Sequence, residues 1–592
     1  MRKFLFLLLL FTASAGADIA IPLAVTLSAI NVSAMPSRQS CVAPCAVKFD
    51  AVGTTSAGVT SKPFHEISYT WGFGDSGAGS WSAWSGMGNS SKNVATGAVA
   101  AHVFETAGTY TVTLSLKDGT NTASAPPITI TVTDPDTVYA TTATVCFYNS
   151  TVGTGCPTGA TQTQSSDFDA ALAACIGTTK RCLFKKGDSF ASSTTGTINA
   201  TGPFTIGAYG SGALPIVTST DISGVLDFTT ASDVRVLDLD IRGNGATDTG
   251  LGINWASGTT SHVLIKGVSI TEIGKGMSVA AVNTLTNGFF VENTVNNYYA
   301  SGGNAFFGSL LGGALMGNTF GPVPAGGSGE HVLRLQHGRK VAITNNLLTT
   351  PNSTKHNLTI RAAAYVGDPA DDSQYIYTSD NKYIGSINAQ MVTLAPSADS
   401  TNERIYDIVM EREWFVSGAS TTTVINDLAT RSTVRNSVFD MSAAAATAIS
   451  VDGQNTGGAP NPDGNSFYNN TFYSSLTTAS TYGISLGGTI NPVSNTTLKN
   501  NLCYTPNVTT NHTVLVSGGG VSGTTGAAGT FGNSSDAQCL TDPFNGVSPT
   551  TPATFLPAGS SYAIDGGATA PVWSDFFGAA RTGTYDMGAV NP

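Results

Sequence analysis

The sequence predicts an all-β protein whose larger part is a parallel β-solenoid, and a repeating apolar pattern is the main reason. Between Asp233 and Cys503, a short apolar strand recurs roughly every 23 to 35 residues, and a second apolar register runs beside it. This period leaves room for three short strands and their turns, but not for a βαβ unit. The strand-end register is Ile241, Ile270, Val295, Phe320, Leu348, Tyr383, Phe415, Val438, Phe472 and Cys503. The second register is Ile253, Val279, Phe306, Leu333, Ile360, Val392, Val424, Ile449, Ile484 and Val514.

Asparagines in phase with the first register support the same fold. They are Asn293, Asn318, Asn346, Asn381, Asn436, Asn470 and Asn501, each two residues before the strand-end apolar residue. Stacked coils would align these amides about 4.8 Å apart, where they can bond to one another. Asparagine also marks turns without any stacking, but seven coincidences with an independent register favour a ladder.

Composition limits the classes of partner. The chain has 592 residues, 41% of them apolar and only 11% charged, with a net charge of −11. This length predicts more than one domain. The acidic balance argues against nucleic acid, and any polyanion bound by this chain would need a local cluster of basic residues.

Residues 1–17 are predicted to be a signal peptide. Arg2 and Lys3 precede an apolar run from Phe4 to Phe11, and Ala15-Gly16-Ala17 has the form of a cleavage site. We therefore expect a secreted protein that is extracellular or held at the cell surface. No later stretch reaches 18 apolar residues, so no membrane span is expected.

The eight cysteines agree with an oxidising compartment. Their spacing suggests local disulfide pairs, although sequence alone cannot establish connectivity. The expected pairs are Cys41 with Cys45, Cys146 with Cys156, Cys175 with Cys182, and Cys503 with Cys539.

Residues 22–134 are predicted to form a small β-sandwich, because strands such as 67–71 and 110–114 alternate in polarity. The segment 71–75, Trp-Gly-Phe-Gly-Asp, together with His102-Val103-Phe104 and residues 107–112, resembles a PKD domain. Gly72 replaces the first Asp of the usual Trp-Asp-Phe-Gly-Asp signature. The resemblance implies a spacer or a module close to carbohydrate rather than a catalytic domain.

Residues 137–592 are predicted to form the solenoid, with an N-terminal cap at about 140–230 and a closing segment at about 540–592. Phe168, Leu172 and Ile176 lie on one side of a helix that Ser166-Asp167 would cap, and such a helix can cover the open end of a coil. The C-terminal segment resembles that of secreted right-handed parallel β-helix proteins of the pectate lyase-like superfamily. In that setting, structural bonds in the closing loops are expected from Asp565, Asp575, Arg581 and Asp586.

A basic cluster between Glu330 and Lys340 stands out in so uncharged a chain. Arg334 is expected to face outward, as is Arg361, which lies 27 residues later and therefore about one coil further on. Two stacked guanidinium groups favour an anion between them, such as a uronate carboxylate or a sulfate. The alternative is a surface network in which Glu330 neutralises both arginines.

Other residues of the cluster have candidate roles. His331 is expected to be a buried structural histidine, whereas His337 is placed in a turn and is the better proton carrier. Substrate contacts are expected from Gln336, Arg339, Lys340, Lys355 and His356.

Leu335-Gln336-His337-Gly338 resembles the strand-end Arg-His-Gly of alginate lyase and chondroitinase B relatives, with Gln336 in place of the arginine. The resemblance implies β-elimination, in which Arg334 could substitute for that arginine. The preceding coil, however, offers Asn304, Ala305 and Phe307 where a catalytic lysine is expected. Calcium is a possible cofactor, held by Asp368, Asp371 and Asp372; the alternative is a solvated acidic loop.

A glycoside hydrolase would need two carboxylates across a bound sugar. Glu330 is one candidate, but Asp452 is about four coils away. Surface ion pairs are expected from the charged run Glu403, Arg404, Asp407, Glu411, Arg412 and Glu413. The sequence thus predicts a protein that engages extracellular polysaccharide. The leading hypothesis is a polysaccharide lyase or related depolymerase with Arg334, Arg361, His337 and Glu330 at its centre; the alternative is a non-catalytic glycan-binding protein.

Overall fold

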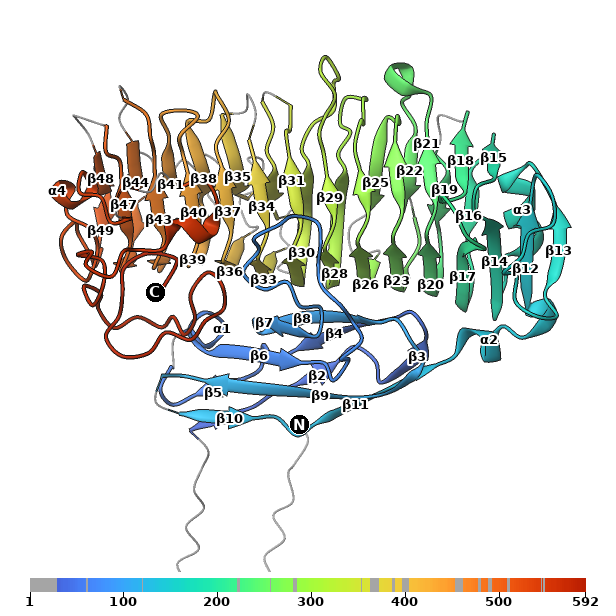
Figure 1. The fold of residues 1–592 in the computed structure, drawn as a ribbon, viewed down its shortest axis with the longest axis horizontal. Coiled ribbons are helices and arrows are strands. Elements are labelled where there is room, and N and C mark those ends of the chain that lie inside the picture. Colours follow the sequence, from blue (N-terminus) through green and yellow to red (C-terminus); the bar gives the residue numbers. More distant parts are fainter. Residues whose placement is uncertain are drawn as a thin grey trace, which may run out of the picture.

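The computed structural model describes residues 29–591 except 60–61, 120, 221–223, 256, 280–284, 353, 363–371, 386–388, 397–403, 453–460, 478–480, 488–491, 508–511, 545 and 547–548. The predicted signal peptide lies outside the described residues. A β-sandwich lies along the flank of a long parallel β-helix, and the C-terminal loops return beside the sandwich (Figure 1). Within the described residues, no helix has the length and apolar character that a membrane crossing requires.

The sandwich contains a six-stranded sheet packed on a three-stranded sheet, with one two-stranded ribbon. The larger sheet contains β3 (Ser40–Val42), β6 (Ser68–Gly72), β7 (Val94–Thr96), β9 (Gly108–Lys117), β10 (Thr122–Ser124) and β11 (Ile128–Thr133). The smaller sheet contains β2 (Met35–Pro36), β4 (Cys45–Asp50) and β8 (Val99–Phe104), and the ribbon is β1 (Ile30–Asn31) with β5 (Thr55–Ser56). Phe49, Trp71 and Phe73 fill the core between the sheets, with ring centroids 5.4 Å apart.

Each coil of the solenoid passes through three parallel sheets, here called sheets 1, 2 and 3, and β28 (Phe306–Met316) and β30 (Leu333–Thr344) run unbroken from sheet 1 into sheet 2. The other strands of sheet 1 are β16 (Gly196–Ile198), β19 (Leu226–Phe228), β22 (Leu251–Asn254), β25 (Lys275–Val279), β32 (Leu358–Ile360), β35 (Gln390–Leu394), β38 (Thr423–Asp427), β41 (Thr447–Asp452), β44 (Thr481–Gly487) and β48 (His512–Ser517). Those of sheet 2 are β12 (Thr144–Tyr148), β13 (Thr161–Gln164), β14 (Lys180–Lys185), β17 (Thr201–Tyr209), β20 (Ala231–Leu237), β23 (Thr260–Lys266), β26 (Leu285–Val291), β33 (Ser373–Ser379), β36 (Ile405–Glu411), β39 (Thr430–Arg435), β42 (Ser466–Tyr468) and β46 (Thr497–Lys499). Sheet 3 contains β15 (Ser189–Ser192), β18 (Ile216–Ser219), β21 (Asp240–Arg242), β24 (Ser269–Thr271), β27 (Thr294–Val295), β29 (Thr319–Phe320), β31 (Leu347–Thr349), β34 (Lys382–Ile384), β37 (Trp414–Val416), β40 (Val438–Asp440), β43 (Thr471–Tyr473) and β47 (Leu502–Tyr504). The all-β, right-handed parallel β-helix expected from the repeat is confirmed.

Short elements complete the chain. The helices are α1 (Pro63–Glu66), α2 (Pro135–Val138), α3 (Phe168–Cys175) and α4 (Asp536–Cys539), with 3-10 turns at Thr141–Ala143, Gly245–Thr247 and Pro552–Phe555 and a last strand pair, β45 (Val493–Ser494) and β49 (Val521–Ser522). Helix α3 begins after Asp167, whose side chain accepts a hydrogen bond from Ala170 N, as predicted for the cap. The structure forms all four predicted disulfides.

Both predicted apolar registers are buried, but five of the predicted residues, Val279, Ile360, Val424, Val438 and Val514, are offset by one or two positions from the residue that pairs in the structure. Leu333 pairs with Leu358, so Ile360 lies two residues further along. In sheet 3, Phe439 rather than Val438 faces inward and stacks on Phe415, with ring centroids 4.7 Å apart. A slip of two residues keeps a side chain on the same face, whereas a slip of one moves it to the other face.

The asparagine ladder is present where sheet 2 turns into sheet 3. Asn346 N and Nδ2 both donate to Asn381 Oδ1 at 2.9 Å. Asn436 does not belong to this ladder: it occupies a left-handed turn position with φ of 51°, and Ser437 takes the ladder position. The neighbouring coil has Glu413 in the ladder, where its carboxylate accepts from Asn381 N at 2.9 Å.

Glu413 predicts a measurable dependence of stability on pH. Its side chain is fully buried, and this burial raises the pKa from 4.5 to about 8. The folded state therefore holds a proton that the unfolded state releases, and stability should fall as the pH rises from about 4.5 to about 8. Glu413→Gln should flatten this decline and stabilise the protein by about 1 to 4 kcal/mol at pH 8. Denaturant titrations across this range measure the difference; an unchanged slope would show that the carboxylate is ionised in the fold. Glu105→Gln, at a 44% exposed side chain, is the control.

The sandwich packs against the outer face of sheet 2. The contact surface on the solenoid, here called the docking stripe, consists of Leu264, Phe289, Ala314, Ala342, Tyr377 and Val409. Polar contacts flank it: Lys340 pairs with Asp50 at 2.7 Å, and Arg412 Nη2 donates to Thr96 Oγ1 at 2.8 Å. A module attached in this way is not a detached spacer.

The charged run that was expected on the surface is largely buried at this junction. Glu411, Arg412 and Glu413 are 5%, 1% and 0% exposed. Arg412 donates twice to the Asp380 carboxylate, at 3.0 and 2.8 Å, because a buried charge needs a close partner. The prediction of surface ion pairs is therefore wrong for these three residues and for Asp407, which is 6% exposed and pairs with Arg431 at 2.7 Å.

The C-terminal residues act structurally, as expected. Arg581 is buried and donates to Gly588 O at 2.7 Å and to Asn436 Oδ1 at 3.2 Å, and its burial lowers the pKa to about 10. Asp575 accepts from Phe577 N, Ala579 N and Asn591 N. These bonds fasten the closing segment to the last coils.

Candidate functional site

A groove lies on the outer face of sheet 1, where β22, β25, β28 and β30 run side by side. Its volume is about 410 Å³. It is lined by Leu251, Asn254, Lys275, Met277, Ser278, Gly302, Asn304, Phe307, Glu330 and Arg334. We call it the sheet-1 groove.

Arg334 is held at the wall of this groove by alternation along β30. Leu333 and Leu335 point into the core, so Arg334 points outward. Its Nε donates to Gln336 Oε1 at 3.0 Å, and its guanidinium lies 5.4 Å from the centroid of the Phe307 ring. Partial burial lowers its pKa, and the nearby Glu330 opposes that shift. Among the described residues, none accepts a hydrogen bond from its two Nη groups, which are the fork that binds a carboxylate.

Glu330 does not seal the arginines. Its Oε1 lies 3.2 Å from Lys355 Nζ, at the rim of the groove. The described residues show no ion pair from Glu330 to Arg334 or to Arg361. The predicted self-neutralising network is therefore absent from this part of the structure, and Lys355 takes the role of carboxylate partner.

Arg361 is close to Arg334 but not stacked on it. Arg334 pairs with Thr359, 25 residues later, so the 27-residue spacing overshoots by two positions. Arg361 N instead donates to Leu335 O at 2.9 Å. Burial lowers the pKa of Arg361, and the charge of Arg334 lowers it further, which places the two cations within electrostatic range. Its buried Nε has no hydrogen-bond partner in the described part of the chain.

His331 and His356 form a neutral pair beside the arginines. Their ring centroids are 4.9 Å apart, and Thr359 Oγ1 lies 3.2 Å from His331 Nδ1 and 3.0 Å from His356 Nδ1. Burial, followed by the adjacent positive groups, lowers the pKa of His331 to about 2 and that of His356 to about 4. Neither ring is charged at neutral pH. His331 is buried, as predicted, and His356 lies next to the site.

His337 cannot carry protons to a substrate. It lies within β30 rather than in a turn, is 0% exposed, and its Nε2 is 3.2 Å from Asp372 O. The pairing of β28 with β30 shifts register at this point, between Gly308 and Ser309, where the strands pass from sheet 1 into sheet 2. The prediction of an exposed, catalytic His337 is wrong.

The second half of the basic cluster faces away from the groove. Arg339 and Lys340 belong to the part of β30 in sheet 2, and Lys340 pairs with the sandwich through Asp50.

Asp372, one of the three expected calcium ligands, is buried and accepts from Arg404 N at 2.7 Å. Asp368 and Asp371, the other expected calcium ligands, lie outside the described residues, and those described contain no group of three or more metal-ligating side chains.

Lys275 is the groove residue that the sequence did not reveal. It begins β25, two residues before the inward Met277, which pairs with Phe306. Phe306 pairs in turn with Leu333 on β30, so Lys275 lies two strands from Arg334, about 10 Å across the strands, and three residues out of register with it, about 10 Å along the strand. The resemblance implies a lysine one coil before Arg334, where this chain has none; Lys275 lies two coils before Arg334. Alternation from the inward Met277 would point Lys275 inward as well, so the sequence pattern gives no signal for it.

The groove contains one carboxylate among its lining residues, that of Glu330. The paired acids of a glycoside hydrolase are not present there. A cationic wall with a lysine and an arginine, facing open space, suits recognition of an acidic ligand instead.

A comparison with known protein families identifies the sandwich. Residues 31–132 match the PKD domain family, which is the module predicted for the sandwich. No relative among curated proteins matches the chain.

Solved structures similar to this chain include three carbohydrate-active enzymes. Pectate lyase Pel9A is 14% identical, with 76% of this chain and 96% of that chain covered and a TM-score of 0.32. Alginate lyase from Paenibacillus sp. str. FPU-7 is 14% identical, with 60% and 95% covered and a TM-score of 0.28. The catalytic unit of the GH87 α-1,3-glucanase from Streptomyces thermodiastaticus strain HF3-3 is 12% identical, with 87% and 98% covered and a TM-score of 0.30.

Proposed function

We propose that this is an extracellular polysaccharide lyase that cleaves uronate-containing chains in the sheet-1 groove. The observation that carries the proposal is that Lys275 and Arg334 line one groove, with the Nη fork of Arg334 unused by the described residues. A glycan-binding protein without catalysis would need only the cation, whereas elimination also needs a base.

The proposed reaction uses Arg334 to neutralise the substrate carboxylate. A bidentate contact from the guanidinium spreads the charge of that carboxylate and stabilises the negative charge that develops when the C5 proton leaves. The Phe307 ring lies beside the guanidinium, with its centroid 5.4 Å away. Gln336 accepts the hydrogen bond from Nε, which leaves the two Nη groups for the substrate.

Lys275 is the proposed base. Its neutral amine takes the C5 proton, the bond between C4 and the glycosidic oxygen breaks, and a double bond forms between C4 and C5. The departing oxygen takes up a proton, and the lysine ammonium returns its own to solvent, so protons and electrons balance. Only a neutral amine can accept this proton. Lys355 and His356, next to the groove, are proposed contacts for neighbouring sugars.

A panel of polymers tests the proposal. The full chain is incubated with polygalacturonate, alginate, hyaluronan and neutral xylan, and the ultraviolet absorbance of an unsaturated product is followed. We expect an increase with at least one uronate polymer and none with xylan. Chain shortening without the absorbance would indicate hydrolysis, and binding without shortening would indicate the non-catalytic alternative.

A further inference from the structure

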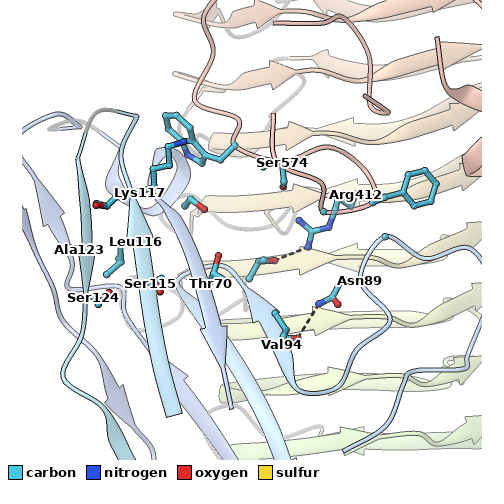
Figure 2. Close-up of a pocket in the computed structure, with 18 residues that line it drawn as sticks. Thr70, Asn89, Val94, Ser115, Leu116, Lys117, Ala123, Ser124, Arg412 and Ser574 are labelled. Atoms are coloured by element: carbon cyan, nitrogen blue, oxygen red, sulfur yellow. Dashed lines mark hydrogen bonds between the residues drawn. The ribbon is translucent and has the colours of Figure 1, made fainter. Parts of the chain in front are cut away.

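A second and larger cleft lies where the sandwich, Arg412 and the C-terminal segment meet (Figure 2). Its volume is about 820 Å³, within the range of pockets that hold small ligands. It shares no lining residue with the sheet-1 groove. We call it the junction cleft.

One wall of the junction cleft is a grid of hydroxyl groups on the larger sandwich sheet. Three neighbouring strands, β6, β9 and β10, present two rows of facing residues. The rows are Ser68, Lys117 and Thr122, then Thr70, Ser115 and Ser124. Neighbouring strands are about 4.8 Å apart. Within the described part of the chain, none of these five hydroxyls makes a hydrogen bond, so all remain available to a ligand.

The C-terminal segment adds aromatic surface to the lining of the junction cleft. Trp573 and Phe577 line it, and both are partly exposed. The indole is held in place, because its Nε1 donates to Glu66 O at 3.1 Å and Lys117 Nζ lies 5.4 Å from its ring centroid. A fixed aromatic ring beside a hydroxyl grid suits a ligand with both an apolar face and many hydroxyls, as a sugar ring has.

The charge of the cleft selects among such ligands. No aspartate or glutamate lines it. Arg412 is already bonded to Asp380, whereas Lys117 makes no ion pair with any described residue. The net positive lining favours a sugar that carries a carboxylate or sulfate group.

We propose that the junction cleft binds an acidic oligosaccharide, with a sugar ring against Trp573, an acidic group near Lys117 and hydroxyls on the grid. It would act as a second binding site, remote from the sheet-1 groove, and the sandwich would supply most of its polar contacts. The proposal does not require the groove to be catalytic.

Binding measurements on the full chain carrying Arg334→Ala test this site separately from the groove. The probes are hexamers of galacturonate and of mannuronate, with neutral cellohexaose as the comparison, and the readout is titration calorimetry. We expect one acidic hexamer to bind and cellohexaose to bind at least tenfold more weakly. Adding Ser115→Asp, which places a carboxylate in the grid, should weaken binding about tenfold or more. Lys117→Gln should also weaken it.

The matched control is Thr129→Asp, on β11. Thr129 is exposed on the same face of the sheet but does not line the cleft. It should leave binding unchanged. The proposal is overturned if neither acidic hexamer binds, if cellohexaose binds equally well, or if Ser115→Asp and Lys117→Gln bind as tightly as their parent. Because elimination is not measured, these outcomes are independent of the proposed lyase activity.

Discussion

Replacing Arg334 with alanine should lower the turnover of a uronate polymer by about a hundredfold to a thousandfold, the effect of removing one strong donor to a developing negative charge. The guanidinium makes one hydrogen bond within the described residues, to Gln336, so the loss should leave the melting temperature close to that of the parent. Initial rates of unsaturated-product formation and a thermal melt measure the two effects.

Two further variants make the Arg334 prediction specific. Arg334→Lys keeps the charge but loses the planar fork, and should recover only part of the rate. Arg242→Ala, at an exposed arginine on sheet 3 that pairs with Asp240, should behave like the parent. Full activity in Arg334→Ala would remove this residue from the site, and unfolding of that variant would make it structural.

Removing the sandwich should unfold or aggregate the solenoid. Residues 137–592 have an apolar core of their own, which alone would favour independent folding. The docking stripe, however, would then be exposed to water, at a cost of about 1.5 to 3 kcal/mol for each large apolar side chain. Buried Arg235 would also lose its hydrogen bonds to Val42 O and Pro44 O, both at 2.9 Å, and would keep only its partner Asp233.

A point variant gives the same test in the full chain. Phe289→Glu would bury an unpaired charge between the two parts and should lower the stability by several kcal/mol. Ser485→Glu, facing outward from sheet 1, is the control. If residues 137–592 unfold cooperatively at the temperature of the parent, the interface contributes nothing to stability.

The sequence predicts the solenoid well because stacked coils need the same kinds of residue at equivalent positions. Inward positions such as Leu333 and Ile449 must be apolar, and the ladder position favours an amide, so both patterns persist through coils of different length. Coil length itself varies, which is why Arg361 was aligned with Arg334 although Thr359 is its true neighbour. A slip of two residues leaves a side chain on the same face of the sheet, but it changes which residue lies next to it on the neighbouring strand.

The site could be predicted only in part for the same reason. Arg334 and Glu330 lie on the coil that drew attention through its charge, whereas Lys275 is a single charge two coils earlier. The sequence does indicate the docking stripe. Val263-Leu264-Ile265 and Phe289-Phe290-Val291 are continuous apolar runs, which are typical of strands covered on both faces. No sequence pattern indicates the bend at His337, because alternation does not show where a strand passes from one sheet into the next.

The central claim is that the sheet-1 groove breaks glycosidic bonds by elimination, and the fate of solvent oxygen tests it most directly. The full chain is given its uronate polymer in water enriched in ¹⁸O, and rapidly quenched products are analysed by mass spectrometry. Elimination retains the glycosidic oxygen on the new reducing end, so we predict unsaturated fragments without ¹⁸O, and none from Lys275→Ala. One ¹⁸O atom at each new reducing end, with no unsaturated fragment, would contradict the account.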